Sequence, residues 1–126
     1  MLAIDLKGRT AVVTGGSGQL GRTICRGLAK CGANVALTYY QSQQQACNLE
    51  EGLQKEFGVK ALALKADVTD IKSLKNAKKT INGRLGTVDI IVNNAVSQYQ
   101  WKEVLKQDTE SYESQFKTSV LHNVFM

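Results

Sequence analysis

The sequence of 126 residues has no proline, a single histidine and three cysteines, and it has no long apolar run. Without proline or a low-complexity linker it offers no domain boundary, and no stretch approaches the roughly 18 apolar residues of a membrane span. The cysteines are odd in number and lack metal-ligand spacing, so we expect reduced thiols and no metal site. Asp5 and Lys7 interrupt the start of the chain. We therefore expect no secretory leader and a cytoplasmic protein.

The chain contains both basic and acidic residues, and its formal net charge is +5. A basic balance suits an anionic ligand. The only dense basic group lies within residues 72–79, where its lysines recur at helical spacing, as on a solvated helix face. Aromatic and basic residues are not interleaved as they are in nucleic-acid-binding proteins. We expect neither a nucleic-acid nor a membrane partner.

Glycine is concentrated directly after the first apolar run. Residues Ala11–Val13 lead into Gly15, Gly16, Gly18 and Gly21, and a helical pattern follows at once. Backbone N–H groups in such a turn and the start of the helix favour an anion, and the missing side chains allow a pyrophosphate to approach. The spacing differs from the strict G-x-G-x-x-G pattern. A plain tight turn between a strand and a helix is the alternative interpretation.

Apolar runs alternate with helical patterns along the whole chain. Strands are expected near residues 10–14, 35–39, 59–66 and 88–92, and helices near residues 20–30, 46–57, 71–85 and 112–124. This alternation predicts an α/β fold with a doubly wound parallel sheet of order 3-2-1-4, truncated after the fourth strand and its following helix. A ligand crevice is expected at the carboxyl ends of strands 1 and 4. It would collect residues 15–20, 39–42, 67–68 and 93–96.

Three motifs resemble those of the short-chain dehydrogenase/reductase family, with the greatest likeness to its 3-oxoacyl-[acyl-carrier-protein] reductase branch. They are Leu6-Lys7-Gly8-Arg9-Thr10-Ala11-Val12-Val13-Thr14-Gly15-Gly16-Ser17, Ala66-Asp67-Val68-Thr69-Asp70 and Val92-Asn93-Asn94-Ala95. The resemblance implies a Rossmann-like fold, a nicotinamide dinucleotide and hydride transfer to or from a small carbonyl or acyl substrate in the full-length enzyme.

The resemblance also implies roles for particular residues. The glycine loop would hold the pyrophosphate and nicotinamide ribose, and Asp67 would bind the adenine amino group with Val68 beside the ring. Asn93 and Ala95 would line the adenosine and nicotinamide-ribose side, and Asn94 would tie the sheet together. Asp67 could instead simply end a strand and begin a turn, and Asn93 and Asn94 could be ordinary turn formers. The expected cofactor-binding residues are Thr14, Gly15, Ser17, Gly18, Gln19, Leu20, Gly21, Tyr39, Asp67, Val68, Asn93, Ala95 and Val96.

Coenzyme choice depends on the end of the second strand. Residues 38–42 contain no carboxylate to bind a ribose diol, which favours NADP(H) over NAD(H). They also contain no arginine or lysine to pair with a 2′-phosphate, and Gly18 occupies a slot where NADP-preferring relatives often carry arginine. Arg22 is close in sequence; it is either a partner for the phosphate or a solvated residue of the first helical turn. NAD(H) therefore remains the alternative.

Two residues depart from the family pattern. Gln19 stands where the second glycine of the loop belongs, and it is expected to crowd the pyrophosphate. Val96 replaces the glycine that usually ends the asparagine motif. The family's Tyr-x-x-x-Lys pair is missing, Ser119 occupies the slot of its helix asparagine, and His122 is expected to pack against a helix or lie on the surface. No catalytic residue is assigned.

These observations predict that residues 1–126 are the dinucleotide-binding half of a reductase, without its catalytic half and without turnover of its own. The uncapped apolar end of the last helix favours an interrupted chain. The alternative is a self-standing nucleotide-binding or regulatory module. Because the fourth strand would lack a neighbour, we also expect a homo-oligomer that buries its edge.

Overall fold

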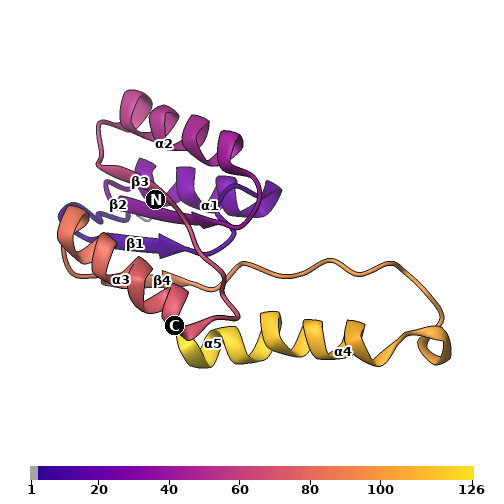
Figure 1. The fold of residues 1–126 in the computed structure, drawn as a ribbon. Coiled ribbons are helices and arrows are strands. Elements are labelled where there is room, and N and C mark those ends of the chain that lie inside the picture. Colours follow the sequence, from indigo (N-terminus) through magenta and orange to yellow (C-terminus); the bar gives the residue numbers. More distant parts are fainter. Residues whose placement is uncertain (1–2) are drawn as a thin grey trace.

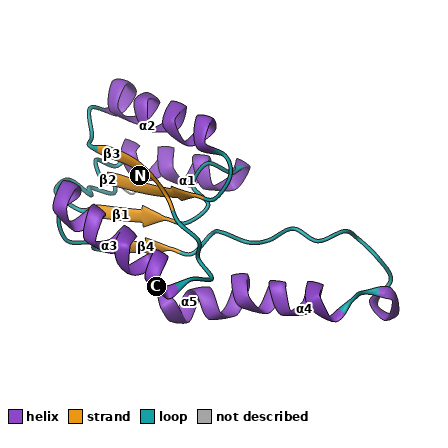
Figure 2. Ribbon diagram, viewed as in Figure 1, coloured by secondary structure: helices purple, strands orange, loops and turns teal. Residues whose placement is uncertain are grey.

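Residues 3–126 are described by a computed structural model, in which four parallel strands form one sheet of order β3-β2-β1-β4 (Figures 1 and 2). The sheet order and the α/β class predicted from the sequence are confirmed. The strands are β1 (Thr10–Val13), β2 (Asn34–Tyr39), β3 (Ala61–Lys65) and β4 (Ile90–Val92). The helices are α1 (Gln19–Lys30), α2 (Gln43–Phe57), α3 (Ile71–Leu85), η1 (Val104–Lys106), α4 (Thr109–Phe116), the π-helical turn η2 (Lys117–Leu121) and α5 (His122–Phe125).

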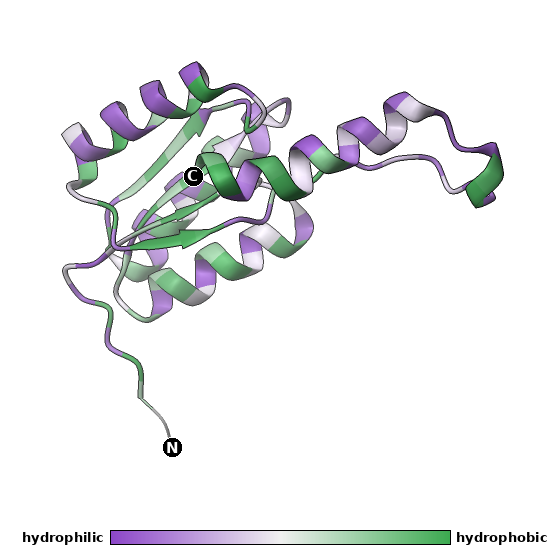
Figure 3. Cartoon of the chain, turned by 90° about the horizontal axis from the view of Figure 1, so that it is seen from below, coloured by the Kyte–Doolittle hydropathy of each residue, from purple (hydrophilic) through white to green (hydrophobic). Residues whose placement is uncertain are grey.

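The two faces of the sheet are covered by different helices. On one face, Val13 and Leu37 of the sheet pack in a cluster with Cys25 of α1 and Leu53 of α2. On the other face, the strand residues that directly precede Val13 and Leu37 in the sequence pack against Ile81 of α3. Alternate residues of a strand point to opposite faces, so the apolar strands fill both clusters. Figure 3 shows the strands as largely hydrophobic and the helices as mixed.

The helix boundaries follow local signals. Asp70 caps α3, because its side chain accepts a hydrogen bond from the backbone N–H of Lys72 at 2.9 Å. α2 ends at Gly58, which adopts the left-handed conformation with φ of 67°. Both ends lie where the sequence predicts them.

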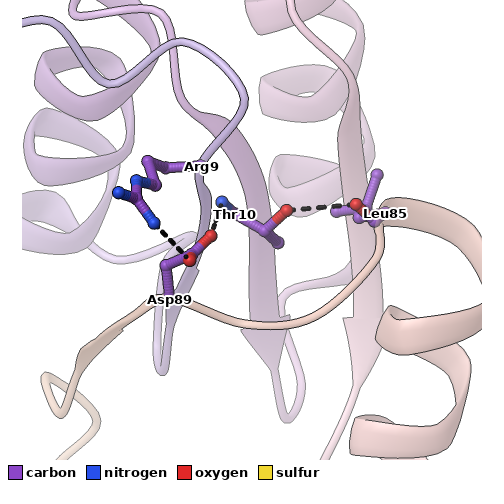
Figure 4. Close-up of polar contacts among 4 residues, drawn as sticks. All are labelled: Arg9, Thr10, Leu85 and Asp89. Atoms are coloured by element: carbon purple, nitrogen blue, oxygen red, sulfur yellow. Dashed lines mark hydrogen bonds and ion pairs between the residues drawn. The ribbon is translucent and has the colours of Figure 1, made fainter.

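A carboxylate joins the start of β1 to the start of β4 (Figure 4). Asp89 accepts a hydrogen bond from the backbone N–H of Thr10 at 2.9 Å and from Arg9 Nη1 at 3.0 Å. The Thr10 hydroxyl in turn donates to the Leu85 carbonyl at 3.1 Å. The Thr10 N–H and then the Arg9 guanidinium lower the pKa of Asp89 below its ordinary value. These contacts tie three segments together at the end of the sheet away from the glycine turn.

After β4, the last helical stretch runs from Thr109 to Phe125 as the sequence predicts, and Asp108 caps it by accepting a hydrogen bond from the Ser111 N–H at 2.7 Å. An extended segment runs away from the sheet, turns at η1 and returns as α4 (Figure 1). The π-helical turn then shifts the register before α5. His122, at the start of α5, is 1% exposed, while Tyr112 and Phe116 are about half exposed. His122 is therefore a packing residue, as one of the two expectations had it.

β4 forms one edge of the sheet and pairs only with β1 among the described residues. Its central residue, Ile91, is 47% exposed. No helix within residues 3–126 is both long and apolar enough to cross a lipid bilayer.

Candidate functional site

A wide crevice opens at the carboxyl ends of the strands, where the sheet order reverses between β1 and β4. Its volume is about 1360 Å³, which exceeds the roughly 300–1,000 Å³ of most small-molecule sites. The crevice therefore has room for an extended ligand. Its walls come from the loops after all four strands and from η2.

Eleven of the thirteen predicted site residues line this crevice: Gly15, Ser17, Gly18, Gln19, Leu20, Gly21, Tyr39, Asp67, Val68, Ala95 and Val96. The other two do not. Thr14 is fully buried behind the glycine turn, and Asn93 is exposed outside the crevice. Sequence reasoning missed the contribution of Ser97, Gln98 and Thr118, since no motif links the segment after β4 to η2.

The glycine turn contains three positions that no larger residue could occupy without movement, and at Gly16 a Cβ would lie 2.5 Å from the Leu37 Cβ. Gly15 has φ of 61°, and a Cβ there would lie 2.9 Å from the Cα of Ala95. A Cβ at Gly21 would lie 2.3 Å from the Gly15 carbonyl oxygen. The loops after β1 and β4 and the first turn of α1 therefore touch through glycine. This close approach keeps the backbone of the turn open to the crevice.

The start of α1 presents unpaired backbone donors at the same place. Gly18 is its N-cap residue, no side chain caps the helix, and its first turn contains no acidic residue. The first N–H groups of a helix have no partner within the helix and carry the positive end of its dipole. The turn and the helix start together form a cradle for an anion. Gln19 is exposed at the start of the helix, beside this cradle.

The ends of β1 and β4 are held together by a hydrogen-bonded pair of residues. The Thr14 hydroxyl accepts hydrogen bonds from the backbone N–H groups of Asn94 and Ala95, both at 3.0 Å. The Asn94 side chain donates to the carbonyls of Thr14 and Gly15, at 3.0 and 3.1 Å. Asn94 thus ties the sheet together, and it also lines the crevice.

Asp67 lies in the loop after β3, with one oxygen occupied and one available. Its Oδ1 accepts hydrogen bonds from the N–H and hydroxyl of Thr69, at 2.9 and 2.6 Å. Its own backbone N–H donates to Ser73 Oγ at 2.9 Å. Within residues 3–126 nothing donates to Oδ2, which leaves an acceptor at the crevice wall beside Val68.

The end of β2 contributes Tyr39, Tyr40, Gln41 and Ser42 to the crevice, and none of them is acidic. A cation reaches this stretch from the neighbouring strand. Lys65 is the register partner of Tyr39, and its Nζ lies 5.9 Å from the centroid of the Tyr40 ring. The sequence offered only Arg22 as a nearby cation, because Lys65 is far from residues 38–42 along the chain. The parallel pairing of the second and third strands was the signal that would have found it.

Beneath the glycine turn lies a buried thiol. Cys25 on α1 is fully buried, and its Sγ donates to the Gly16 carbonyl at 4.0 Å. Burial raises the pKa of this thiol to about 12. Cys31 and Cys47 are partly exposed, and all three cysteines are free. Cys25 therefore fills space under the turn as a neutral, unreactive group.

Two further aromatic residues of the sequence, Tyr112 and Trp101, lie outside the crevice. The Tyr112 hydroxyl donates to the Val104 carbonyl at 3.2 Å, outside the crevice. Trp101 is 92% exposed, and its ring centroid lies 5.9 Å from that of Tyr99. Within residues 3–126, no three histidine, cysteine or acidic side chains are grouped closely enough to hold a metal ion.

Comparison with curated proteins finds oxidoreductases. The sequence model of the short chain dehydrogenase family matches residues 9–126. The chain is 36% identical over 124 residues to L-rhamnose 1-dehydrogenase (NADP(+)) of Thermoplasma acidophilum, covering 98% of this chain and 48% of that protein. It is 34% identical over 120 residues to NADP-dependent mannitol dehydrogenase of Aureobasidium melanogenum, covering 94% and 45%.

Comparison with solved structures finds the same fold. L-sorbose reductase from Gluconobacter frateurii, complexed with NADPH and L-sorbose, superposes with a TM-score of 0.88 at 25% identity, over 98% of this chain and 46% of that one. A short chain dehydrogenase from Burkholderia cenocepacia in complex with NADP gives 0.87 at 31% identity, over 95% and 48%. The chain therefore spans less than half the length of these relatives.

Proposed function

The chain belongs to the short chain dehydrogenase family, and on that premise we propose that it binds NADP(H) as the cofactor-binding half of an oxidoreductase. The observation that carries the proposal is the glycine turn, where Gly15 and Gly21 leave no room for a Cβ and the uncapped start of α1 faces a crevice. The pyrophosphate would lie on this turn. NAD(H) is the alternative coenzyme.

Further residues of the crevice suit the remaining parts of a dinucleotide. The open acceptor Oδ2 of Asp67 suits the adenine amino group, and Val68 would pack beside the ring. Leu20 is 66% exposed at the cradle and would be covered by a bound ribose or nicotinamide. The bound coenzyme would supply the hydride chemistry. We propose that Ala95 and Val96 contact the nicotinamide side of the coenzyme. Asn93 would contribute only through its backbone, next to Asn94.

We further propose that residues 1–126 form one dinucleotide-binding domain and that the catalytic residues of the family lie outside it. No Tyr-x-x-x-Lys pattern occurs in the sequence. The parent enzyme would reduce a small carbonyl or acyl compound, or oxidise the corresponding alcohol, in the cytoplasm, where free thiols persist. The proposal includes no nucleic-acid or membrane partner.

Association with a second copy is also part of the proposal. β4 leaves one edge unpaired within residues 3–126, and Ile91, Tyr112 and Phe116 expose about half of their side-chain surface. An open strand edge beside exposed apolar side chains favours association. Sizing experiments at tens of micromolar protein should show a dimer or larger assembly. A stable monomer would count against this part of the proposal.

The central test is a calorimetric titration of the chain with NADPH and NADH. We expect saturable binding with one site per chain and a preference for NADPH. Neither nucleotide binding at millimolar concentration would overturn the proposal. A separate assay with NADPH and simple ketones or 3-oxoacyl esters should give no turnover above background.

A self-standing nucleotide-binding module is the second candidate function. The observation that favours it is that the loops after all four strands, which form the crevice, lie within this chain. The intact mass of the protein in its own cell separates the two. A mass near 13.8 kDa supports the module, and a mass about twice as large supports the parent reductase.

A further inference from the structure

We propose that Lys65 binds the 2′-phosphate of the coenzyme and thereby sets the preference for NADP(H) over NAD(H). This inference rests on the proposed function and adds to it a residue that selects between the two coenzymes. The ligand chemistry is a phosphomonoester on the adenosine ribose, the one group by which the two coenzymes differ.

The position of Lys65 follows from the pairing of β2 and β3. Tyr39 and Lys65 are register partners, and the Ala66 N–H donates to the Tyr39 carbonyl at 2.9 Å. Parallel strands end at the same edge of a sheet, so Lys65 reaches the place where β2 gives way to the loop before α2. Its sequence neighbour Ala66 and its aromatic partner Tyr40 both line the crevice. Lys65 itself is not a lining residue, and its ammonium group lies at the rim of the crevice through its contact with Tyr40.

The side chain of Lys65 is held near this rim but keeps its charge available. Its Nζ lies 5.9 Å from the Tyr40 ring centroid, within the range of a cation–π contact. Tyr40 is 58% exposed. Within residues 3–126 no carboxylate lies within 4 Å of this Nζ. The ring thus orients an ammonium group that no acidic side chain neutralises.

The surroundings favour an anion over a ribose diol. No residue from Thr38 to Ser42 is acidic, and the first turn of α2 contains no acidic residue. Ser42 lines the crevice and makes no capping hydrogen bond, so its hydroxyl is available as a donor. A phosphomonoester carries about −1.5 to −2 charges at neutral pH and accepts several hydrogen bonds. Lys65 and Ser42 together can supply the cation and one donor.

The test uses the full chain and two probes that differ only by the phosphate, 2′,5′-ADP and 5′-AMP. We expect Lys65→Met to weaken binding of 2′,5′-ADP roughly tenfold, since a hydrogen bond to a charged group is typically worth that factor or more. Binding of 5′-AMP should change less than about twofold, because Lys65 does not contact the adenine or the 5′-phosphate in this scheme. Calorimetry at low and high salt measures both constants.

Matched variants separate this role from a general effect of charge. Lys60→Met removes the same charge just before β3, at the end of the strand away from the crevice, and should change neither constant. Lys65→Arg keeps the charge and should retain the preference. The salt dependence of 2′,5′-ADP binding should be smaller in Lys65→Met than in Lys65→Arg. Circular dichroism checks that each variant is folded.

The outcomes of these titrations distinguish a failure of the Lys65 assignment from a failure of the proposed function. An unchanged ratio of the two affinities in Lys65→Met overturns the assignment of Lys65 and leaves nucleotide binding standing. Equal affinities of the unaltered chain for both probes overturn it as well. Binding of neither probe overturns both this inference and the proposed function.

Discussion

Thr14 and Asn94 hold the ends of β1 and β4 together through two hydrogen bonds, both of which Asn94 donates to Thr14. The Asn94 backbone N–H donates to the Thr14 hydroxyl, and the Asn94 side chain donates to the Thr14 carbonyl, each at 3.0 Å. The two residues are far apart in the sequence, yet they join the ends of β1 and β4 where the sheet order reverses. Both side chains therefore have a structural role behind the candidate nucleotide site.

Replacing Thr14 tests this pair. Thr14→Val removes the hydroxyl that accepts from the N–H groups of Asn94 and Ala95 and leaves both without this partner. We expect a loss of about 2 kcal/mol in the free energy of unfolding. Thr14→Ser keeps the acceptor and is the control. Urea unfolding measures both variants, and equal midpoints for the two would contradict the role assigned to the hydroxyl.

Replacing Gly21 tests the close approach in the glycine turn. A Cβ there would lie 2.3 Å from the Gly15 carbonyl oxygen and 2.9 Å from the Asn94 side-chain nitrogen. Gly21→Ala should therefore cost about 1–3 kcal/mol of stability and weaken NADPH binding.

Gly27→Ala on the same helix is the control for this prediction. A Cβ at Gly27 meets nothing within 4 Å, so alanine should stabilise α1 by up to about 1 kcal/mol. Thermal unfolding compares the two variants. If Gly21→Ala were as stable as Gly27→Ala, the turn would have room for a Cβ at residue 21, contrary to the close contacts in the structure.

The stability of the fold should depend on the ionisation of Asp89. Its pKa is lowered in the folded state by the Thr10 N–H and then by Arg9. Ionisation therefore stabilises the fold above the ordinary pKa of about 3.9, and this contribution is lost as pH falls through the lowered value. Asp89→Asn should be less stable than the unaltered chain at pH 7, and the difference should shrink at lower pH.

The control for Asp89 is an exposed ion pair. Glu51→Gln breaks the contact with Lys55, whose side chain is 78% exposed, and should change stability little at either pH. Urea midpoints at pH 7 and pH 3 provide the comparison. A constant gap between Asp89→Asn and the unaltered chain at both values would rule out the proposed ionisation effect.

Thiol labelling should separate Cys25 from the other two cysteines. Because Cys25 is fully buried and its pKa is raised to about 12, it should react only when α1 opens away from the sheet. Cys31 and Cys47 are partly exposed and should react first. Kinetics with a chromogenic disulfide reagent should show two faster thiols and one slow one. Cys25→Ser should remove only the slow phase.

Local sequence patterns predict most of the fold correctly. The apolar runs and the helical spacing of Leu20, Ile24 and Leu28 predict β1 to β4 and α1 to α3, because both kinds of pattern depend on residues within a few positions. The loops of the crevice follow from the strand order. After β4 the patterns predict the last helix and its Asp108 cap correctly. They do not predict the π-helical turn within it or the burial of His122, because neither depends on local spacing alone.

The sequence by itself determined that this protein is a parallel α/β domain with a glycine-rich anion cradle, because periodicity and glycine spacing are local properties. Only the tertiary structure decided which distant side chains meet. Asn94 reaches Thr14, and Lys65 reaches Tyr40, through the register of neighbouring strands. Strand register is set by packing over the whole sheet. For that reason residues 38–42, which contain no basic residue, have a cation beside them that belongs to the neighbouring strand β3.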